Sequence, residues 1–470
     1  MQAHPESTNG IVRNDLAQGI DRPALSVALV STCPPRQCGI ATFTSDLAQA
    51  IKQAEPATRL RWVAINEADS SHLYEPNVRW RIRQGDAVSY RDAAKHLNAS
   101  HVDVVSVQHE FGLYGLWGDD QFEDHLAPFL ETLRKPLVTT LHTVLPDPSP
   151  SVREAVRRIG HHSQVVVVMA ELAKRMLVDD YGLIEAKVRV IPHGVPPVEP
   201  RGRRRTKARF GWQGRTILST FGLLDPRKGL EYMIEAMVAV TRQHPDALYV
   251  IVGKTHPELV QRAGEMYRQQ LNDLVRALGL RTHVAFVNDY LTQAQIVEYL
   301  VASDLYVTPY LDRNQITSGT LAYALGAGKA IISTRYLHAT EVLADGRGIL
   351  VPFRDADALA AASLRILGDP DYKEQLESAA YRYGRGTTWP SVGRRMLDLF
   401  RSVAWPPSAT EVEPGVNWGL ARVEEPPADE RCPSAPPIAE PIGIHTAPPP
   451  NSVRAAQSKV AADAPLLSSR

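Results

Sequence analysis

Cysteine is scarce in this sequence, with Cys33, Cys38 and Cys432 as the three thiols among 470 residues. So few and so scattered cysteines exclude a disulfide framework and a cysteine-based zinc site, and we expect reduced thiols. No run approaches the ~20 apolar residues of a membrane-spanning helix, and no apolar segment follows a basic start as in a secretory signal. These absences predict a protein of the cytoplasm.

The chain also lacks a net charge, because 52 Lys and Arg residues balance 52 Asp and Glu residues. This balance gives no support for a nucleic acid partner. No G-x-G-x-x-G motif with a following acidic residue occurs, so a nicotinamide-dependent dehydrogenase is the weakest of the functional alternatives. A chain of this length exceeds what one hydrophobic core usually serves, and we therefore expect two domains.

Apolar runs alternate with helical periodicity along both halves of the chain. The runs predicted as strands are Leu25–Ser31, Leu60–Ile65, Val102–Val107, Leu137–Leu141, Val165–Met169, Val188–Ile191, Thr216–Phe221, Leu248–Val252, Val284–Phe286, Ser303–Pro309 and Ala330–Ser333. The predicted helices are Ala41–Gln53, Tyr90–Leu97, Asp119–Leu133, Val152–Ile159, Leu172–Asp180, Leu230–Val240, Pro257–Leu278, Gln293–Ala302, Thr320–Leu325, Asp355–Leu367, Tyr372–Tyr383 and Pro390–Val403. The alternation predicts an α/β protein with two doubly wound, Rossmann-like parallel sheets.

Composition changes mark the domain boundaries. Pro196–Lys207 is rich in proline and arginine and is the best candidate for a linker. Residues 1–24 are polar and predict a mobile tail. Residues 405–470 are rich in proline and alanine, have almost no apolar periodicity, and predict a disordered tail. Between the tails we expect domains at 25–200 and 201–385, followed by a helix at 386–404.

Polar residues follow three of the predicted strands in the first domain. His109 and Glu110 follow Val102–Val107, His142 follows Leu137–Leu141, and His193 follows the strand that ends at Ile191. Ligands of open parallel sheets bind beyond the carboxyl ends of the strands. A single histidine is more often structural than catalytic, but three at one sheet edge favour a polar cleft.

Three loops are candidates for holding an anion. Thr317, Ser318, Gly319 and Thr320 open a helix between two strands, where free N–H groups and the helix dipole attract negative charge. Arg227 and Lys228 come just before another helix, where they can reach phosphate oxygens. Gly39 ends the loop after the first strand and lets a ligand approach the backbone. The alternatives are an ordinary strand-to-helix turn at residues 317–320, surface basic residues at a turn for Arg227 and Lys228, and a glycine that simply ends a loop for Gly39.

Several short motifs, in this order and spacing, resemble the retaining glycosyltransferases of family four, the "group 1" glycosyltransferases. They are PPRQCGIATF, QHEFG, LHT, VIPHGV, FGLLDPRKG, SDLYVTPY, ALGAGKAIIS and the HATEVL–GILV pair, spread between residues 34 and 351. The QHEFG and LHT segments look closest to a mannosyltransferase-like branch. The resemblance covers residues 25–403 and implies a GT-B fold.

The resemblance also implies roles for the domains and residues. Residues 201–385 would bind a nucleotide-diphosphate sugar, residues 25–200 would bind the acceptor, and the helix at 386–404 would return to the first domain. Lys228 matches the family's phosphate-binding lysine, and the amides of residues 317–320 match its phosphate-binding helix start. His142 matches a histidine near the donor sugar, and Gly39 lies in the loop that approaches the donor. Catalysis in the family needs no metal and no cofactor.

Three positions depart from the family pattern. Gln315 and Tyr323 replace glutamates that usually face the donor sugar and bind the ribose. The usual arginine beside the lysine loop is Leu223 here, which leaves Arg227 as a substitute. Glu341 is retained near the following strand and is assigned to the donor site.

We therefore expect a hexosyltransferase that moves mannose or glucose to a saccharide or lipid-linked acceptor. The alternatives are a GT-B protein that binds a sugar nucleotide or glycan without transfer, and a sugar-nucleotide epimerase. Peripheral contact with the inner face of the membrane stays open.

Overall fold

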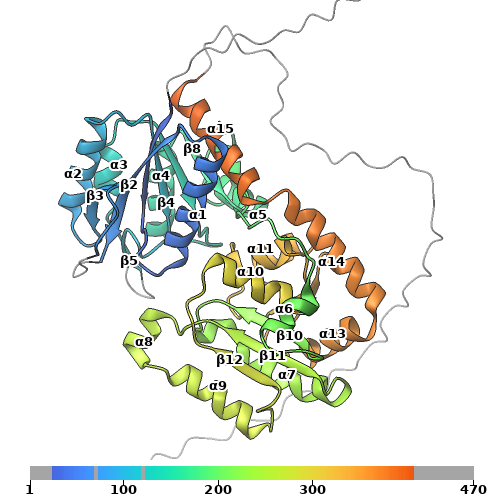
Figure 1. Cartoon of the computed structure of the whole chain (residues 1–470). Helices are drawn as coiled ribbons and strands as arrows, with labels where there is room; N and C mark the ends of the chain where they lie inside the picture. The colour runs from blue at the N-terminus through green and yellow to red at the C-terminus, as the bar shows by residue number, and fades with distance from the viewer. Residues whose placement is uncertain (1–23, 68–71, 118–121, 407–470) are drawn as a thin grey trace, which may run out of the picture. The chain divides into compact units, whose positions relative to one another are not determined.

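The computed structural model describes residues 24–67, 72–117 and 122–406. The predicted tails at 1–24 and 405–470 lie outside these ranges, apart from residues 24, 405 and 406. Each described half is built on its own parallel sheet, and we call these halves the N-terminal lobe and the C-terminal lobe (Figure 1). The predicted α/β class with two doubly wound sheets is confirmed.

The N-terminal lobe contains a seven-stranded sheet of order β3-β2-β1-β4-β7-β8-β9, in which all paired strands are parallel. Its strands are β1 (Ser26–Ser31), β2 (Arg59–Asn66), β3 (Val78–Arg83), β4 (Val104–His109), β7 (Leu137–Leu141), β8 (Val165–Val168) and β9 (Val188–Val190). Every residue of β1, β4, β7 and β8 is buried, which explains the continuous apolar runs in the sequence. The strand order reverses between β1 and β4, the position at which such sheets bind ligands.

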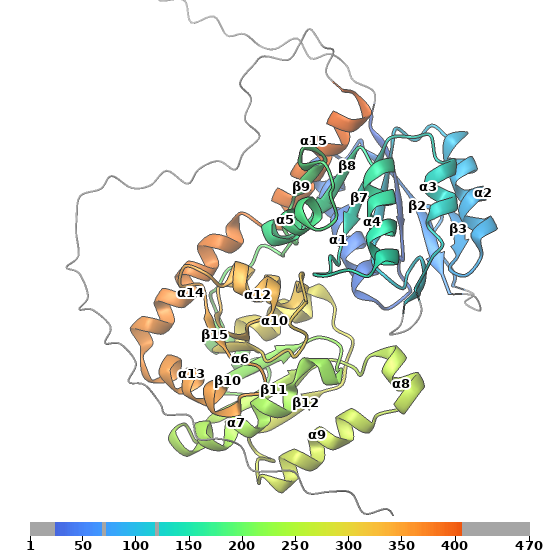
Figure 2. The same cartoon turned by 180° about the vertical axis from the view of Figure 1, so that it is seen from behind.

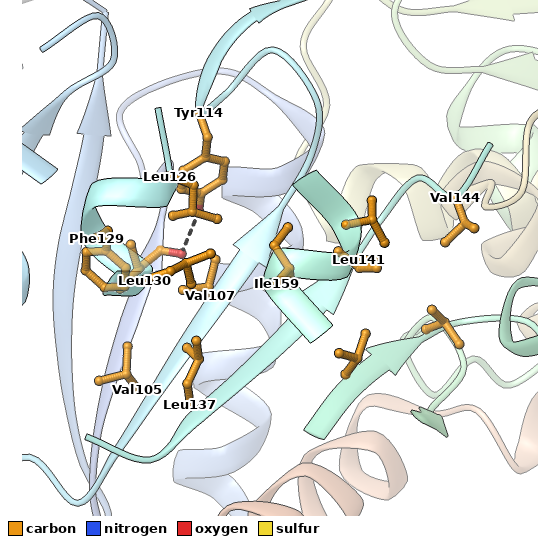
Figure 3. Close-up of a cluster of buried hydrophobic side chains, with 14 of the residues drawn as sticks. Val105, Val107, Tyr114, Leu126, Phe129, Leu130, Leu137, Leu141, Val144 and Ile159 are labelled. Atoms are coloured by element: carbon orange, nitrogen blue, oxygen red, sulfur yellow. Dashed lines mark hydrogen bonds between the residues drawn. The ribbon is translucent and has the colours of Figure 1, made fainter. Parts of the chain in front are cut away.

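Helices cover both faces of this sheet. One face packs against α2 (Ala87–Asn98), α3 (Ala127–Thr132), α4 (Pro150–His162) and α5 (Glu171–Asp179). Figure 3 shows this core, where Val105 and Val107 of β4 meet Phe129 of α3 and Ile159 of α4. The other face packs against α1 (Gly39–Ala54) and α15 (Trp389–Ala404).

The C-terminal lobe contains a six-stranded parallel sheet of order β12-β11-β10-β13-β14-β15. Its strands are β10 (Thr216–Phe221), β11 (Ala247–Val252), β12 (Val284–Val287), β13 (Leu305–Thr308), β14 (Ala330–Thr334) and β15 (Ile349–Val351). The surrounding helices are α6 (Arg203–Arg209), α7 (Leu230–Gln243), α8 (Pro257–Ala263), α9 (Met266–Ala277), α10 (Gln293–Ala302), α11 (Gly319–Gly326), α12 (Leu337–Val342), α13 (Ala356–Gly368) and α14 (Pro370–Arg385), with the short 3-10 turn η2 (Pro226–Lys228). The 3-10 turn η1 (Glu185–Lys187) belongs to the N-terminal lobe, where it precedes β9. The helices α7, α9 and α13 pack on one face of the sheet, and α10, α11 and α12 on the other.

The last helix, α15, belongs to the core of the N-terminal lobe although it follows α14 in the chain (Figures 1 and 2). Gly393 of α15 lies against Ala50 of α1 so closely that an added Cβ would be 2.7 Å from the Ala50 carbonyl carbon. Trp389, at its start, covers Gly194 at the end of the first lobe. The helix therefore ties the end of the described chain to the first sheet.

Three sequence predictions are wrong in detail. The helix predicted at 119–133 is an antiparallel hairpin of β5 (Gly115–Trp117) and β6 (Phe122–Asp124) followed by the short helix α3, with residues 119–121 outside the described ranges. The Asp124 carboxylate accepts the Leu126 N–H and ends the extended segment. The long helix predicted at 257–278 is broken into α8 and α9 at Gly264, whose φ of 59° is left-handed. The linker predicted at 196–207 becomes helical at Arg203.

Candidate functional site

The carboxyl edge of the first sheet brings the predicted polar residues of β4 and β7 together. His109 pairs with Leu141 in the parallel register, so the residues that follow each strand are neighbours. The backbone N–H of His142 donates to the His109 carbonyl at 3.0 Å. The sequence prediction that these residues share one edge follows directly from this register.

His142 is held by a buried amide. Its Nε2 lies 3.0 Å from Gln108 Oε1, and Gln108 is completely buried. The Gln108 amide nitrogen in turn donates to Ser106 Oγ at 3.3 Å. Burial lowers the pKa of His142 to about 3, with a further contribution from His193. The imidazole is therefore neutral at physiological pH, and Gln108 selects its orientation.

His109 faces the interior of the lobe. Its ring stacks on Tyr114 with centroids 5.4 Å apart and meets the edge of Phe111 at 5.1 Å. Its Nδ1 is buried without a hydrogen-bond partner among the described residues. Burial lowers the pKa of His109 to about 4, so this side chain is also neutral.

Glu110 is a half-buried carboxylate at the same edge. It accepts a hydrogen bond from Thr143 Oγ1 at 2.9 Å and one from the Phe111 N–H at 3.0 Å. Burial raises the pKa of Glu110 to about 7, and these two bonds act in the opposite direction. Each oxygen accepts one hydrogen bond from the protein, so each keeps capacity for a further donor.

His193 lies close to the first turn of α11 in the C-terminal lobe. Its Nδ1 is 2.8 Å from the Gly194 carbonyl, and burial lowers its pKa to about 4. A Cβ on Gly319 would be 2.8 Å from His193 Nε2, so only glycine fits without a shift. The Phe43 ring contacts both His142 and His193, with centroid distances of 4.8 and 5.0 Å. Gly39 begins α1, four residues before Phe43, and Cys38 caps this helix.

Lys228 ends the short turn η2, after β10. Its Nζ lies 3.8 Å from the centroid of the Tyr310 ring, and burial lowers its pKa to about 8. Gly229 follows with a left-handed φ of 58°, and the Pro309 carbonyl leaves no room for a Cβ there. Lys228 also lines a small pocket with Gly222 and other residues of the loop that follows β10.

Tyr310 connects Lys228 with the first turn of α11. Its hydroxyl is 2.7 Å from Thr320 Oγ1, while its ring lies under the ammonium group. The two predicted phosphate-binding loops are therefore adjacent. Tyr310 was not among the predicted site residues, although its position two residues after β13 is a signal that could have found it.

The start of α11 is partly occupied by the protein itself. Ser318 caps the helix by accepting the Leu321 N–H, and the Ser318 N–H donates to His338 Nδ1 at 3.0 Å. Of the four amides predicted to bind phosphate, that of Ser318 is therefore engaged. The amides of Gly319 and Thr320 belong to the first turn, where an α-helix supplies no intrahelical acceptor.

The other predicted donor-site residues have partners within the protein. Arg227, with its side chain 71% exposed, is bound to Asp225 through Nε and Nη2. The Gln315 amide donates to the Thr317 carbonyl at 3.1 Å. The predicted donor-site roles of Arg227 and Gln315 remain predictions.

Tyr323 and Glu341 bond to the N-terminal lobe. The Tyr323 hydroxyl donates to Asp46 of α1 at 3.1 Å, and Gln293 donates to the same Asp46 oxygen at 2.9 Å. Glu341 accepts the N–H groups of Glu171 and Leu172 at 2.8 Å each. Asp46 and Gln293 were not among the predicted residues, and no local sequence pattern marks them.

The part of the chain that the structure describes contains neither a metal-binding cluster nor a membrane-spanning helix. In the described ranges, no three His, Cys, Asp or Glu side chains gather as ligands for a metal ion. No helix within those ranges has both the length and the apolar character needed to cross a bilayer.

Two parallel-sheet lobes with sites at their carboxyl edges define a GT-B fold. The structure of Anabaena Alr3699/HepE in complex with UDP superimposes with a TM-score of 0.64 at 15% identity, covering 80% of this chain and all of the other. The family model "Glycosyl transferases group 1" matches residues 203–383, and "Glycosyltransferase Family 4" matches residues 39–199. The chain belongs to the family four glycosyltransferases.

Curated relatives match part of this chain at 25% identity. A GDP-mannose-dependent phosphatidylinositol monomannoside mannosyltransferase of Mycolicibacterium smegmatis is 25% identical over 261 residues, which are 53% of this chain and 65% of the relative. A D-inositol 3-phosphate glycosyltransferase of Kineococcus radiotolerans is 25% identical over 300 residues, which cover 57% of this chain and 66% of the relative. The match thus spans just under two thirds of these relatives.

Proposed function

We propose that this protein is a retaining hexosyltransferase that uses a nucleotide-diphosphate sugar as donor. The observation that carries the proposal is the adjacency of the Lys228 ammonium group and the first turn of α11, joined through Tyr310. A cation and free helix-start amides form a site for the diphosphate. The names of the relatives favour mannose or glucose as the transferred sugar.

The proposed reaction breaks the bond between the sugar C1 and the diphosphate oxygen and forms a bond from C1 to an acceptor hydroxyl oxygen. Negative charge develops on the leaving diphosphate while the sugar becomes cation-like. Lys228 and the Gly319 and Thr320 amides would stabilise the leaving group without a metal ion. Neutral His142 would contact the sugar by hydrogen bonding, and the proton released by the acceptor hydroxyl would pass to the diphosphate.

We place the acceptor, a saccharide or a lipid-linked saccharide, at the edge formed by β4 and β7. The proposal includes a cytoplasmic location, with peripheral contact at the inner face of the membrane if the acceptor is lipid-linked.

A second candidate is a protein that binds a sugar nucleotide without transfer. The observation that favours it is that Gln315 and Tyr323 replace family glutamates, and that the Tyr323 hydroxyl is bonded to Asp46. Retention of Lys228 and His142 together favours the transferase.

The test is a donor panel of GDP-mannose, UDP-glucose and UDP-galactose with their free diphosphates. Binding is measured by calorimetry, and turnover by release of the nucleotide diphosphate. Binding of one donor with slow release supports the transferase, and NMR of the product anomer decides retention. Tight binding without release, with acceptors present, supports the second candidate. Absence of binding to every donor contradicts both.

A further inference from the structure

The acceptor edge of the N-terminal lobe carries a carboxylate that lacks a cationic partner. Among the described residues, Glu110 forms no ion pair within 4 Å, and its two hydrogen bonds come from neutral groups, Thr143 and the Phe111 amide. The adjacent imidazoles of His109 and His142 are held in their neutral forms by burial. Above its raised pKa of about 7, Glu110 is therefore the charged group among these three residues.

The segments that follow the neighbouring strands supply little positive charge. The loops directly after β1, β4, β7 and β8 contain one arginine, Arg36, and no lysine. The Arg36 guanidinium is engaged at 2.8 Å by Glu67, beside β2. Asp147, in the loop after β7, adds a second carboxylate.

The arginines of β3 are too far away to change this balance. Arg79, Arg81 and Arg83 are exposed on β3, which is separated from β4 by β2 and β1. Three strand spacings amount to about 14 Å, beyond the length of an arginine side chain. An anionic group bound beside Glu110 would thus meet repulsion with no nearby cation from these strand-end loops.

We infer that Glu110 accepts a hydrogen bond from a hydroxyl of the acceptor, and that this edge selects an uncharged saccharide or polyol over a phosphorylated one. The inference rests on the proposed transferase function and specifies its acceptor. It separates this chain from the Kineococcus radiotolerans relative, whose name states an inositol phosphate substrate. A hydroxyl bound to a carboxylate forms a charge-assisted hydrogen bond, whereas a phosphate at the same place brings two like charges together.

The experiment measures binding of acceptor probes to the full chain by calorimetry and ligand-observed NMR, at a pH above the Glu110 pKa of about 7 so that the carboxylate is ionised. The neutral probes are methyl α-D-mannopyranoside, methyl β-D-glucopyranoside and myo-inositol, and the charged probes are mannose 6-phosphate and myo-inositol 1-phosphate. We expect at least one neutral probe to bind about tenfold more tightly than any phosphorylated one, as one charge-assisted hydrogen bond allows.

Two variants isolate the charge of Glu110. Glu110→Gln keeps the shape of the side chain and one acceptor oxygen. It should lower the affinity for neutral probes severalfold and reduce the difference in affinity between neutral and phosphorylated probes. Glu154→Gln removes an exposed carboxylate on α4 of the same lobe and should leave both affinities unchanged. Thermal unfolding of each variant confirms that the lobe is intact.

A wild-type preference for a phosphorylated probe, equal behaviour of the two variants, or absence of binding to all neutral probes would overturn the inference. Donor binding is measured separately in the same samples without acceptor. Loss of donor binding contradicts the proposed function, whereas probe selectivity without donor still reports on Glu110.

Discussion

At the scale of single residues, burial decides the charge of the groups assigned to chemistry. His142, His109 and His193 all have pKa values lowered by burial, and the pKa of Lys228 is lowered for the same reason. Desolvation destabilises the charged form of each group. The first three are neutral near pH 7, while Lys228 keeps its proton until about pH 8.

Lys228 predicts a pH dependence of donor binding. Because its pKa is about 8, the ammonium charge is present below that pH and is lost above it. We expect the affinity for GDP or UDP to fall from about pH 7 to about pH 9.5, by roughly tenfold if the charge contributes about 1.4 kcal/mol. Calorimetry at each pH measures the effect.

The matched variants for this prediction are Lys228→Arg and Lys228→Met. Arginine keeps its charge over the whole range and should flatten the pH profile, whereas methionine should weaken binding at every pH. Lys254→Met removes an exposed lysine and should reproduce the wild-type profile. A wild-type affinity that does not change with pH contradicts the assignment of Lys228 to the diphosphate.

Gln108 predicts a second pH effect. Gln108→Glu would place a carboxylate where the amide oxygen now lies 3.0 Å from His142 Nε2, and would raise the pKa of that imidazole. The variant should lose transfer activity as the pH falls below the raised pKa, a decline that the wild type lacks because its His142 pKa is about 3. A pH–rate profile and NMR titration of His142 measure it.

The control is Ser106→Ala, which removes one hydrogen bond to Gln108 but no contact to His142. It should keep the wild-type pH profile. If Gln108→Glu has the same profile as the wild type, then His142 does not act as a neutral group in transfer.

At the scale of elements, continuous apolar runs correctly predicted the buried strands. Strands without such a run were not predicted. The strand β7 was predicted at its observed bounds because all five residues are buried. The strand β3 was missed because arginines alternate with apolar residues along this edge strand, so no apolar run is present. The hairpin of β5 and β6 was missed because its two strands have three residues each.

The candidate site was also predictable only in part: the residues at strand ends were predicted, but their distant hydrogen-bond partners were not. Strand ends indicated His109, Glu110 and His142, since parallel strands share their carboxyl edge. The hydrogen bond from Ser318 to His338 and that from Tyr323 to Asp46 join residues 20 and 277 positions apart. Such partners depend on tertiary packing, which local sequence patterns do not encode.

The packing of α15 on α1 predicts a strong effect at Gly393. An added Cβ would be 2.7 Å from the carbonyl carbon and 2.8 Å from the Cβ of Ala50, so the two helices would have to separate. Gly393→Ala should destabilise the protein by about 1–3 kcal/mol, as overpacking of a core does. Thermal and urea unfolding measure the change.

Gly368→Ala is the matched control for Gly393→Ala. Gly368 is also helical, at the end of α13, and an added Cβ there meets nothing within 4 Å. Its substitution should leave stability unchanged or slightly higher. Equal stability of the two variants would show that α15 does not depend on close contact with α1.

At the scale of the whole molecule, a partly buried charged cluster joins the start of the C-terminal lobe to its last helix. Asp304, at the start of β13, pairs with Lys207 and Arg203 of α6, and Arg203 pairs with Glu377 of α14. Lys329 lies beside this cluster, 1% exposed, and donates to the Ser303 carbonyl at 3.1 Å. Ionic contacts thus hold α6, the first helix of the C-terminal lobe, to the rest of that lobe.

Lys329 predicts how the stability of the protein changes with pH. Burial lowers its pKa from 10.5 to about 7, an effect increased by Arg203 and Lys373 and reduced by Glu377 and Asp304. Between these values the unfolded chain binds one proton more than the folded one, so stability contributed by this group rises with pH, by up to about 1.4 kcal/mol per pH unit. Lys329→Met should remove that rise in urea unfolding from about pH 7 to about pH 9, while exposed Lys254→Met keeps it. If the slopes of all three proteins coincide, Lys329 remains charged in the folded state, and its electrostatic attraction to Asp304 and Glu377 outweighs its burial.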